Sequence, residues 1–226
     1  MIAAPSAQTD PLVHGLETTV NETVAALKSD PVFGSLFDGT ASRELYLKFL
    51  QRTYHYVNYT TEQLKKASRI FGDRPGELDQ IMHQRFLHHA KEEHGHELWV
   101  LDDIRAIGGD ADETMKADPG VAVKSYLTMA ELILASRTPI AIIGLGGLLE
   151  GISAQLGTAA ANSMRSVSKI PNVENALKFF DSHGEADAYH IIEQRETLVK
   201  IHDEADRRAL LLCAQMTSFQ YRHLLV

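Results

Sequence analysis

The sequence predicts an all-α protein. Apolar residues recur at helical period along almost the whole chain, and convincing period-two alternation of a half-buried strand is absent. The 226 residues are 44% hydrophobic and 23% charged, which is enough apolar material to bury a sizeable core. No low-complexity linker divides the chain, so we expect one helical domain over residues 1–226.

Seven helices are expected, and glycine or proline marks many of their ends. The first covers about residues 10–28 and ends before Pro31, because proline disfavours the helical conformation of the residue that precedes it. The second begins with a cap near Thr40 or Ser42 and stops at Gly72. The remaining helices are expected at about 75–107, 121–136, 139–165, 172–190 and 191–225, with a candidate break in the last one near residue 203.

Charge and cysteine content exclude several classes of protein. Lys and Arg number 22 against 30 Asp and Glu, a net charge of -8, and no basic stripe is present, so no nucleic-acid partner is expected. The single cysteine, Cys213, rules out an intrachain disulfide and a cysteine-rich metal cluster. It lies in an apolar segment, where a buried small hydrophobic residue is the simplest interpretation.

The sequence also predicts no membrane partner. Residues 1–11 lack the basic and apolar regions of a signal peptide. The most apolar run, between Pro139 and Glu150, is shorter than the roughly 20 residues that a membrane span needs. We therefore expect a cytoplasmic protein and interpret this run as part of a core helix.

The same run is rich in glycine. Four glycines inside a helix cost roughly 1 kcal/mol each relative to alanine, so a compensating interaction is expected. Close helix packing would provide it, and so would room for a bound group beside Glu150. These glycines are Gly144, Gly146, Gly147 and Gly151.

A cluster of metal-ligand residue types lies in the segment "SHGEADAYH". At 100° per residue, His183, Asp187 and His190 project within a fan roughly 60° wide and share one helix face. The two histidines lie about 10.5 Å apart along the axis, whereas a metal–nitrogen bond is only about 2.1 Å. Two ions a few ångströms apart therefore suit this face better than one.

The first half of the chain repeats the pattern. His89, Glu93 and His96 have the same i, i+4, i+7 spacing, although a solvated helix face would also explain "HAKEEHGHE". Carboxylate-x-x-histidine pairs on two helices, together with carboxylates from other helices, are typical of di-iron bundles. Glu150 provides a further carboxylate in the most apolar helix, where a lone charge costs several kcal/mol or takes up a proton. Histidine and carboxylate without thiolate favour iron or manganese over copper or structural zinc.

Three segments, "EEHGHELW", "GLLEG" and "SHGEADAYH", resemble the haem-oxygenase-like dimetal oxidases. These are iron-containing redox enzymes related in fold to thiaminase II and pyrroloquinoline quinone synthase. The resemblance covers most of the chain and includes intervals of about 54 residues from His96 to Glu150 and about 33 from Glu150 to His183. It implies a seven-helix haem-oxygenase-like bundle, often a homodimer.

The resemblance also implies a site with two iron ions, or a manganese–iron pair, and O2 as co-substrate. The ligands that it implies are Glu93, His96, Glu150, His183, Asp187 and His190. Some members place the first carboxylate three residues before the histidine and others place it seven before, where this chain has His89, so Glu93 is the first choice. Glu92 is therefore kept as a substitute ligand and His89 as an additional one. Because metal binding and local order are coupled, we expect residues 180–192 to be irregular or mobile in the metal-free protein.

The implied function is that of an O2-activating non-haem di-iron oxidase or oxygenase. Its substrate would be a small amine- or carboxylate-containing metabolite, changed by oxidative C–C cleavage, decarboxylation or N-oxygenation. A thiaminase-like hydrolase of the same fold would need Cys213 as its nucleophile, and a haem oxygenase would need His14 as its proximal ligand. A non-enzymatic metal-binding helical protein, such as a metal store, is a fourth hypothesis.

Overall fold

The structure is a computed structural model that describes residues 10–225, except for the side chains of residues 185, 186 and 188. The signal-peptide expectation falls mainly on residues 1–9, which lie outside the described part. Within residues 10–225 the chain forms helices, turns and loops and contains no strand. The all-α prediction is therefore confirmed.

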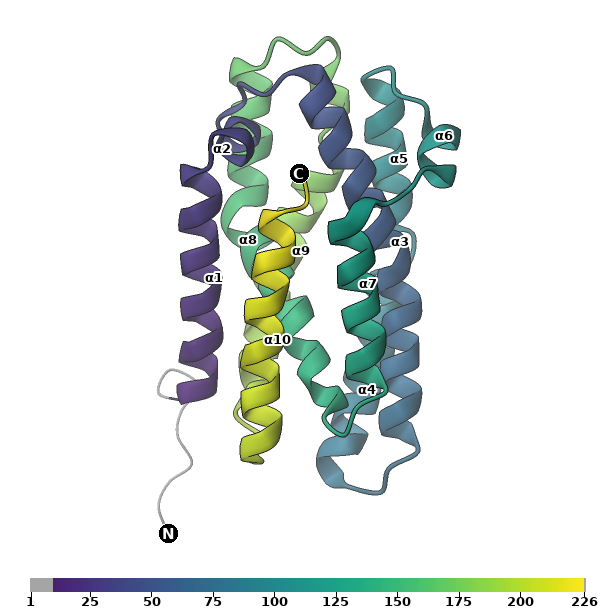
Figure 1. Cartoon of the computed structure of the whole chain (residues 1–226), viewed down its shortest axis with the longest axis vertical. Coiled ribbons are helices and arrows are strands. Elements are labelled where there is room, and N and C mark those ends of the chain that lie inside the picture. The colour runs from purple at the N-terminus through teal and green to yellow at the C-terminus, as the bar shows by residue number, and fades with distance from the viewer. Residues whose placement is uncertain (1–9, 226) are drawn as a thin grey trace.

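Most of the helices are long rods that lie side by side along the longest axis of the molecule (Figure 1). Within the described residues the helices are α1 Pro11–Ser29, α2 Pro31–Asp38, α3 Arg43–Gly72, α4 Glu77–Glu92, α5 His96–Ala106, α6 Ala111–Lys116, α7 Gly120–Leu134, α8 Ile142–Val167, α9 Lys178–Leu198 and α10 Glu204–Arg222. Short 3-10 helices lie at Pro139–Ala141 and Val173–Asn175. The difference from the seven predicted helices comes from the short helices α2 and α6 and from one predicted helix that is divided in two.

The divided helix is the one predicted over residues 75–107. It breaks between α4 and α5, because Gly95 adopts a left-handed conformation with φ of 92° that an α-helix cannot include. Glu93 ends α4 as its C-cap, and His96 begins α5. The carbonyl of Glu93 accepts hydrogen bonds from the Thr61 hydroxyl at 3.2 Å and from the His96 N–H at 3.4 Å, which satisfies a helix end inside the bundle.

The predicted boundary at residues 190 and 191 is also wrong. Helix α9 continues without interruption from Lys178 to Leu198, and the break falls at residues 199–203. Asp203 then caps α10 by accepting hydrogen bonds from two backbone N–H groups, so the candidate break near this residue is confirmed. Residues 180–192 are helical throughout in this structure. Their mobility in the metal-free protein stays a prediction.

Helix α8 is a central helix of the bundle and explains the glycine-rich run. A Cβ atom on Gly144 would overlap the Leu210 carbonyl of α10, and one on Gly151 would meet Val20 of α1 at 2.7 Å. Close packing therefore requires glycine at these positions. At Gly146 an added Cβ would meet only Glu150, at 3.6 Å, so the expected room beside this carboxylate is present as well.

The apolar segment is longer than the sequence indicated. Pro139–Val167, which joins the 3-10 helix to α8, is a helical segment of the described chain that is long and apolar enough to cross a membrane by length and composition. Within the bundle, however, 72% of its most apolar window is buried. The burial accounts for its hydrophobicity as that of a core helix.

The start of α9 depends on a buried carboxylate of α5. Helix α9 positions His183, Asp187 and His190. Asp103 is fully buried, and its two oxygens accept hydrogen bonds from the backbone N–H groups of Lys178 at 3.0 Å and Phe179 at 2.9 Å. Such a cap stabilises a helix by about 1 kcal/mol. Burial raises the pKa of Asp103 to about 7, although the two N–H donors act in the opposite direction.

We predict that Asp103→Asn flattens the pH dependence of stability. The pKa of Asp103 is about 7 in the folded protein, against a reference value of 3.8, so the folded state holds this proton more tightly. The resulting stabilisation is fully present below the unfolded pKa and is lost as pH rises through about 7. Urea unfolding in the presence of a chelator should show a smaller loss of unfolding free energy between about pH 5 and pH 8 in the variant than in the wild type.

Asp102→Asn is the matched control. The pKa of Asp102 is lowered by its hydrogen bond with Lys178, so its loss cannot flatten the same pH profile. An Asp103→Asn protein whose pH dependence equals that of the wild type would contradict the prediction.

Candidate metal centre

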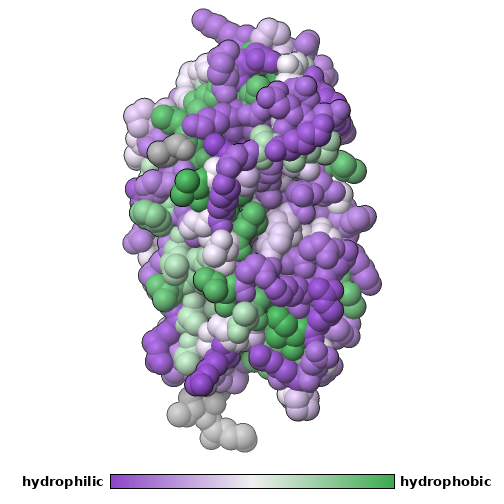
Figure 2. Space-filling model, turned by 45° about the vertical axis from the view of Figure 1, so that its right-hand side comes forward, coloured by the Kyte–Doolittle hydropathy of each residue, from purple (hydrophilic) through white to green (hydrophobic). Residues whose placement is uncertain are grey.

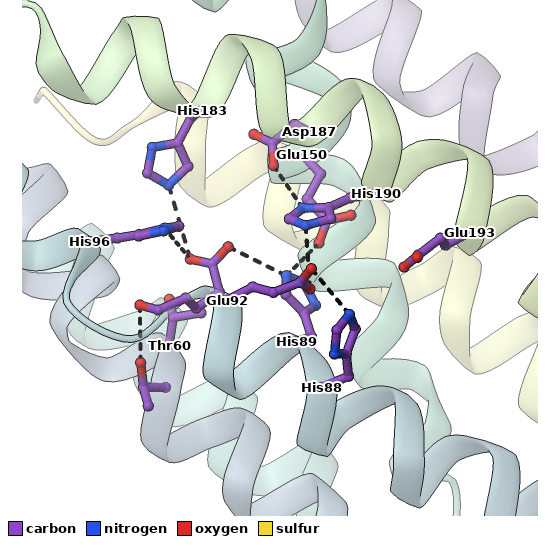
Figure 3. A network of polar contacts seen from close by, with 12 residues as sticks. Thr60, His88, His89, Glu92, His96, Glu150, His183, Asp187, His190 and Glu193 are labelled. Atoms are coloured by element: carbon purple, nitrogen blue, oxygen red, sulfur yellow. Dashed lines mark hydrogen bonds and ion pairs between the residues drawn. The ribbon is translucent and has the colours of Figure 1, made fainter.

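The predicted ligands converge between four helices in the interior of the bundle (Figure 3). Helix α4 and its C-cap contribute the side chains from residues 89 and 93, α5 begins with residue 96, and α8 contributes Glu150. Helix α9 contributes His183, Asp187 and His190. Glu93, His96 and the three α9 side chains are buried. In contrast, His88 is largely exposed, so the α4 segment combines a solvated face with a buried one.

Two stripes of ligand residues face each other and run in antiparallel directions. One lies on α4 and α5 (His89, Glu93 and His96), and the other lies on α9 (His183, Asp187 and His190). The rings of His96 and His183 lie 4.8 Å apart, and those of His89 and His190 lie 4.7 Å apart. In Figure 3 the first pair lies on one side of the network and the second pair on the other. The repeated sequence spacing thus forms two separate groups of side chains.

The first group contains Glu93, His96 and His183, whose ligand atoms all lie within 4.8 Å of one another. Glu93 Oε2 lies 3.1 Å from His96 Nδ1 and 4.0 Å from His183 Nε2. These distances leave a common position that one ion can share among a carboxylate oxygen and two imidazoles.

The second group contains His89, Glu150 and His190, and its ligand atoms also lie within 4.8 Å of one another. His89 Nε2 lies 3.5 Å from Glu150 Oε1 and 3.4 Å from Glu93 Oε1. Glu93 therefore directs one oxygen toward each group. His89, considered from the sequence only as an additional ligand, has a central place in the second group.

Asp187 belongs to neither group, and its described contact is with a histidine. Its Oδ1 lies 3.1 Å from His190 Nδ1, and Nδ1 of His183 donates to the Phe179 carbonyl at 3.1 Å. A histidine that donates through Nδ1 keeps the Nε2 lone pair free for a metal. Asp187 thus orients His190, while its predicted role as a direct ligand stays a prediction.

Glu92, the substitute ligand, lies at the edge of the centre. Its Oε2 is 3.6 Å from His190 Nε2, and its Oε1 is 3.2 Å from His88 Nε2 (Figure 3). The side chain is partly exposed, whereas Glu93 is buried. The geometry therefore favours Glu93 as the central carboxylate.

Burial and charge in the centre fit a bound cation. His89 Nε2 and Glu150 Oε2 are buried, and neither has a hydrogen-bond partner among the described residues. Burial raises the pKa of Glu150 and lowers the pKa of His183. Burial would also raise the pKa of Glu93, but the nearby His89 ring and the hydrogen bond with His96 hold it well below its usual range. Nitrogen and oxygen donors without sulfur fit iron or manganese.

A cavity of about 120 Å³ adjoins both groups. Ligand-group side chains form part of its wall, and mostly apolar side chains from α3, α8 and α9, with others from α2, α4, α7 and α10, form the rest. Among the few polar groups in the wall are Arg85 and Gln63. The cavity gives a small molecule room beside the centre.

Trp99 is a neighbour of the centre that the ligand pattern did not predict. It stacks on His96 with a ring separation of 3.9 Å and an interplanar angle of 22°, and it meets His183 edge-on at 5.7 Å. It is the only tryptophan of the chain. Its position three residues after His96, one helical turn along α5, could have indicated from the sequence that the two rings are neighbours.

An all-α bundle with carboxylates and histidines clustered in its interior is typical of helical proteins with non-sulfur metal centres. The sequence profile of the iron-containing redox enzymes matches residues 47–220, and the chain belongs to this family. No curated protein matches the sequence.

Two solved structures show the same fold. A domain of unknown function with a haem oxygenase-like fold from Shewanella denitrificans OS217 has a TM-score of 0.80 at 23% identity, over 94% of this chain and 90% of that one. A TenA homologue from Pseudomonas syringae pv. tomato strain DC3000 has a TM-score of 0.79 at 10% identity, over 100% of this chain and 96% of that one. The predicted haem-oxygenase-like bundle is therefore confirmed.

We predict that Fe(II) binding quenches the fluorescence of Trp99. A paramagnetic ion in the first group would lie next to the His96 ring, on which the indole stacks at 3.9 Å. Anaerobic titration of chelator-treated protein should give saturable quenching, with about two ions bound per chain by metal analysis. His183→Ala should abolish the quenching, whereas His89→Ala should lose about one ion and keep it.

His94→Ala is the matched control, because His94 is an exposed histidine next to the same turn. It should titrate like the wild type. Quenching that persists in His183→Ala, or that disappears in His94→Ala, would contradict the assignment of the first group.

Proposed function

We propose that this chain is an O2-activating non-haem di-iron oxidase or oxygenase that acts on a small amine- or carboxylate-containing metabolite. The observation that carries the proposal is the position of Glu93, whose Oε1 and Oε2 face two different histidine–carboxylate groups. Membership of the iron-containing redox enzymes supports both the metal and the class of chemistry.

In this proposal each group holds one ion. Glu93, His96 and His183 hold the first, and His89 and Glu150 hold the second together with His190. A pair of iron ions, or a manganese–iron pair, supplies electrons and a place for O2 to bind. The protein supplies anionic ligands that offset most of the charge of the cations.

Neighbouring groups of the chain fix the ligands and keep water out. Asp187 and the Phe179 carbonyl hold the rings of His190 and His183 with Nε2 free. The mostly apolar walls of the cavity limit the water beside the centre, which strengthens electrostatic interactions there and protects reactive species from hydrolysis. Oxidative C–C cleavage, decarboxylation and N-oxygenation all need these conditions.

The properties of Cys213 favour the oxidase over a thiaminase-like hydrolase. The thiol is buried on α10, and burial raises its pKa to about 12, so it carries almost no thiolate at neutral pH. It is not among the described residues that line the cavity beside the centre. A nucleophilic role would require both reactivity and access.

A haem oxygenase and a metal store also have less support than the oxidase. His14 is exposed on α1 and is not among the described residues that line the cavity, whereas a proximal haem ligand must face the haem pocket. A metal store would need the ligand groups but not an apolar cavity beside them. Substrate binding explains the cavity, and iron sequestration does not.

We predict that the chain loaded anaerobically with Fe(II) consumes O2 faster than the same amount of free Fe(II). It should also develop a transient visible absorbance that the Zn(II)-loaded protein lacks. His89→Ala should reduce the O2 consumption at least about tenfold, because one ion is lost. Stopped-flow absorbance and an oxygen electrode provide the measurements.

Cys213→Ala separates the oxidase from the hydrolase. It should retain O2 consumption, since the buried thiol does not line the cavity. O2 consumption equal to that of free Fe(II), or its loss in Cys213→Ala, would refute the proposed function.

We further propose that the chain forms a homodimer through α10. Leu212, Met216 and Phe219 are exposed and share one face of this helix at i, i+4, i+7 spacing. The face that includes α10 and α7 carries apolar patches among polar side chains (Figure 2). Exposed apolar patches of this kind mark interaction surfaces.

Leu212→Glu/Phe219→Glu should convert the dimer to a monomer, because burying these carboxylates without partners is costly. Light scattering after gel filtration gives the mass directly. As a control, Leu132→Glu places a carboxylate on an exposed apolar position of α7. A wild-type monomer, or an unchanged dimer in the double variant, would be incompatible with this interface.

A further inference from the structure

Arg85 places a positive charge in the wall of the cavity beside the candidate metal centre. It precedes His89 by one helical turn on α4, and Arg85, His89 and Glu93 follow each other at i, i+4, i+8. This spacing puts all three side chains on one face of the helix, and all three line the cavity. The arginine side chain is only 15% exposed.

The guanidinium lacks the partners that a nearly buried charge normally has. Its one ionic contact among the described residues is with Glu193 Oε2 of α9, at 3.6 Å, and that carboxylate side chain is 52% exposed. An ion pair of this kind contributes little stability. No hydrogen bond joins the five N–H donors of Arg85 to any described residue within 3.5 Å.

Planar guanidinium groups bind carboxylates through two parallel hydrogen bonds. We propose that Arg85 binds the carboxylate of the substrate and makes the cavity selective for small carboxylates over amines. This inference rests on the proposed function of the neighbouring centre and chooses between its two substrate classes. An ammonium group in the same place would be repelled by the arginine.

The position of Arg85 also orients the bound molecule. One helical turn separates it from His89, about 6 Å along the axis of α4. With the carboxylate on Arg85, the carbons a few bonds away lie beside the second ligand group, and the rest of the molecule contacts apolar walls.

Gln63 provides a second polar contact nearer the centre. Its side chain is buried and lines the cavity, and its Oε1 has no hydrogen-bond partner among the described residues. Helices α3 and α4 run antiparallel, with hydrogen bonds from Thr61 to Glu93 and from Ser68 to His83. Interpolation between these contacts places Gln63 at the level of His89.

The competing explanation is a structural one, in which Arg85 only joins α4 to α9 through Glu193. A structural pair predicts that removing either partner has the same effect on stability and no effect on ligand selectivity. A carboxylate site predicts that Arg85 and Glu193 act in opposite directions, because Glu193 competes with the ligand for the guanidinium.

Calorimetric titration of the Zn(II)-loaded protein tests the proposal without O2 chemistry. The probes are hexanoate, hexylamine and hexanol, which share one apolar chain. The wild type should bind hexanoate more tightly than the other two. Arg85→Gln should weaken hexanoate binding about 10- to 100-fold and leave hexanol binding unchanged, as expected for loss of a charged hydrogen-bonded pair. Arg85→Lys should retain part of the selectivity.

Glu193→Gln is the matched variant and should bind hexanoate as tightly as the wild type or more tightly. Equal hexanoate affinity in the wild type and Arg85→Gln would overturn the proposal, and so would wild-type affinity for hexanoate no greater than for hexanol. Equal losses of stability in Arg85→Gln and Glu193→Gln, with the selectivity for hexanoate unchanged, would establish the structural pair instead.

The same titrations in chelator-treated protein separate this proposal from the proposed function. The ratio of hexanoate affinities between the wild type and Arg85→Gln is measured whether or not the chain binds two ions. Arg85→Gln should also retain the metal-induced quenching of Trp99, because it removes no member of either ligand group.

Discussion

The structure depends on one costly feature, a cluster of carboxylates and histidines buried between α4, α5, α8 and α9. A lone charge in such surroundings costs several kcal/mol, so the cluster is stable only if every charge has a partner. Glu93 has one in the first histidine pair and another in His89. Glu150 has only His89 as a described ion-pair partner, and its Oε2 has no hydrogen bond among the described residues. The deficit of positive charge is therefore concentrated at the second group, where a cation would restore the balance.

The backbone places these side chains by different means on the two sides. Helix α9 is continuous, so His183 and His190 lie two turns apart, and its start is fixed by the buried Asp103. The facing stripe is interrupted at Gly95, which turns the chain so that His96 begins a new helix. Because the stripes run antiparallel, each histidine meets a partner from the other one, and two groups form in place of one long row.

The sequence predicted the helical class, and the clustering of the candidate ligand side chains, through features that are local, while the two-ion site stays a prediction. Repeated i, i+4, i+7 spacing gives the direction of a side chain, and an isolated Glu150 in an apolar helix indicates burial. It did not predict the break before His96, because Gly95 was fitted into an ideal helix, although glycine is the usual residue for a left-handed helix end. It also left His89 outside the first choice of ligands. Whether His89 is a ligand depends on its neighbours from other helices, and the spacing of residues along one helix gives no information about those neighbours.

The charge of the whole cavity gives an independent reason for an anionic substrate. Two divalent cations bring four positive charges, and Glu93, Glu150 and Asp187 bring three negative ones, while neutral histidines add none. Arg85 in the wall of the same cavity adds a positive charge that the half-exposed Glu193 carboxylate, 3.6 Å away, offsets in part. Once both ions are bound, the interior therefore carries an excess of positive charge in a largely apolar enclosure, where electrostatic interactions are strong. A bound carboxylate lowers that excess and an ammonium group raises it, so loading the metal centre itself selects for the anion.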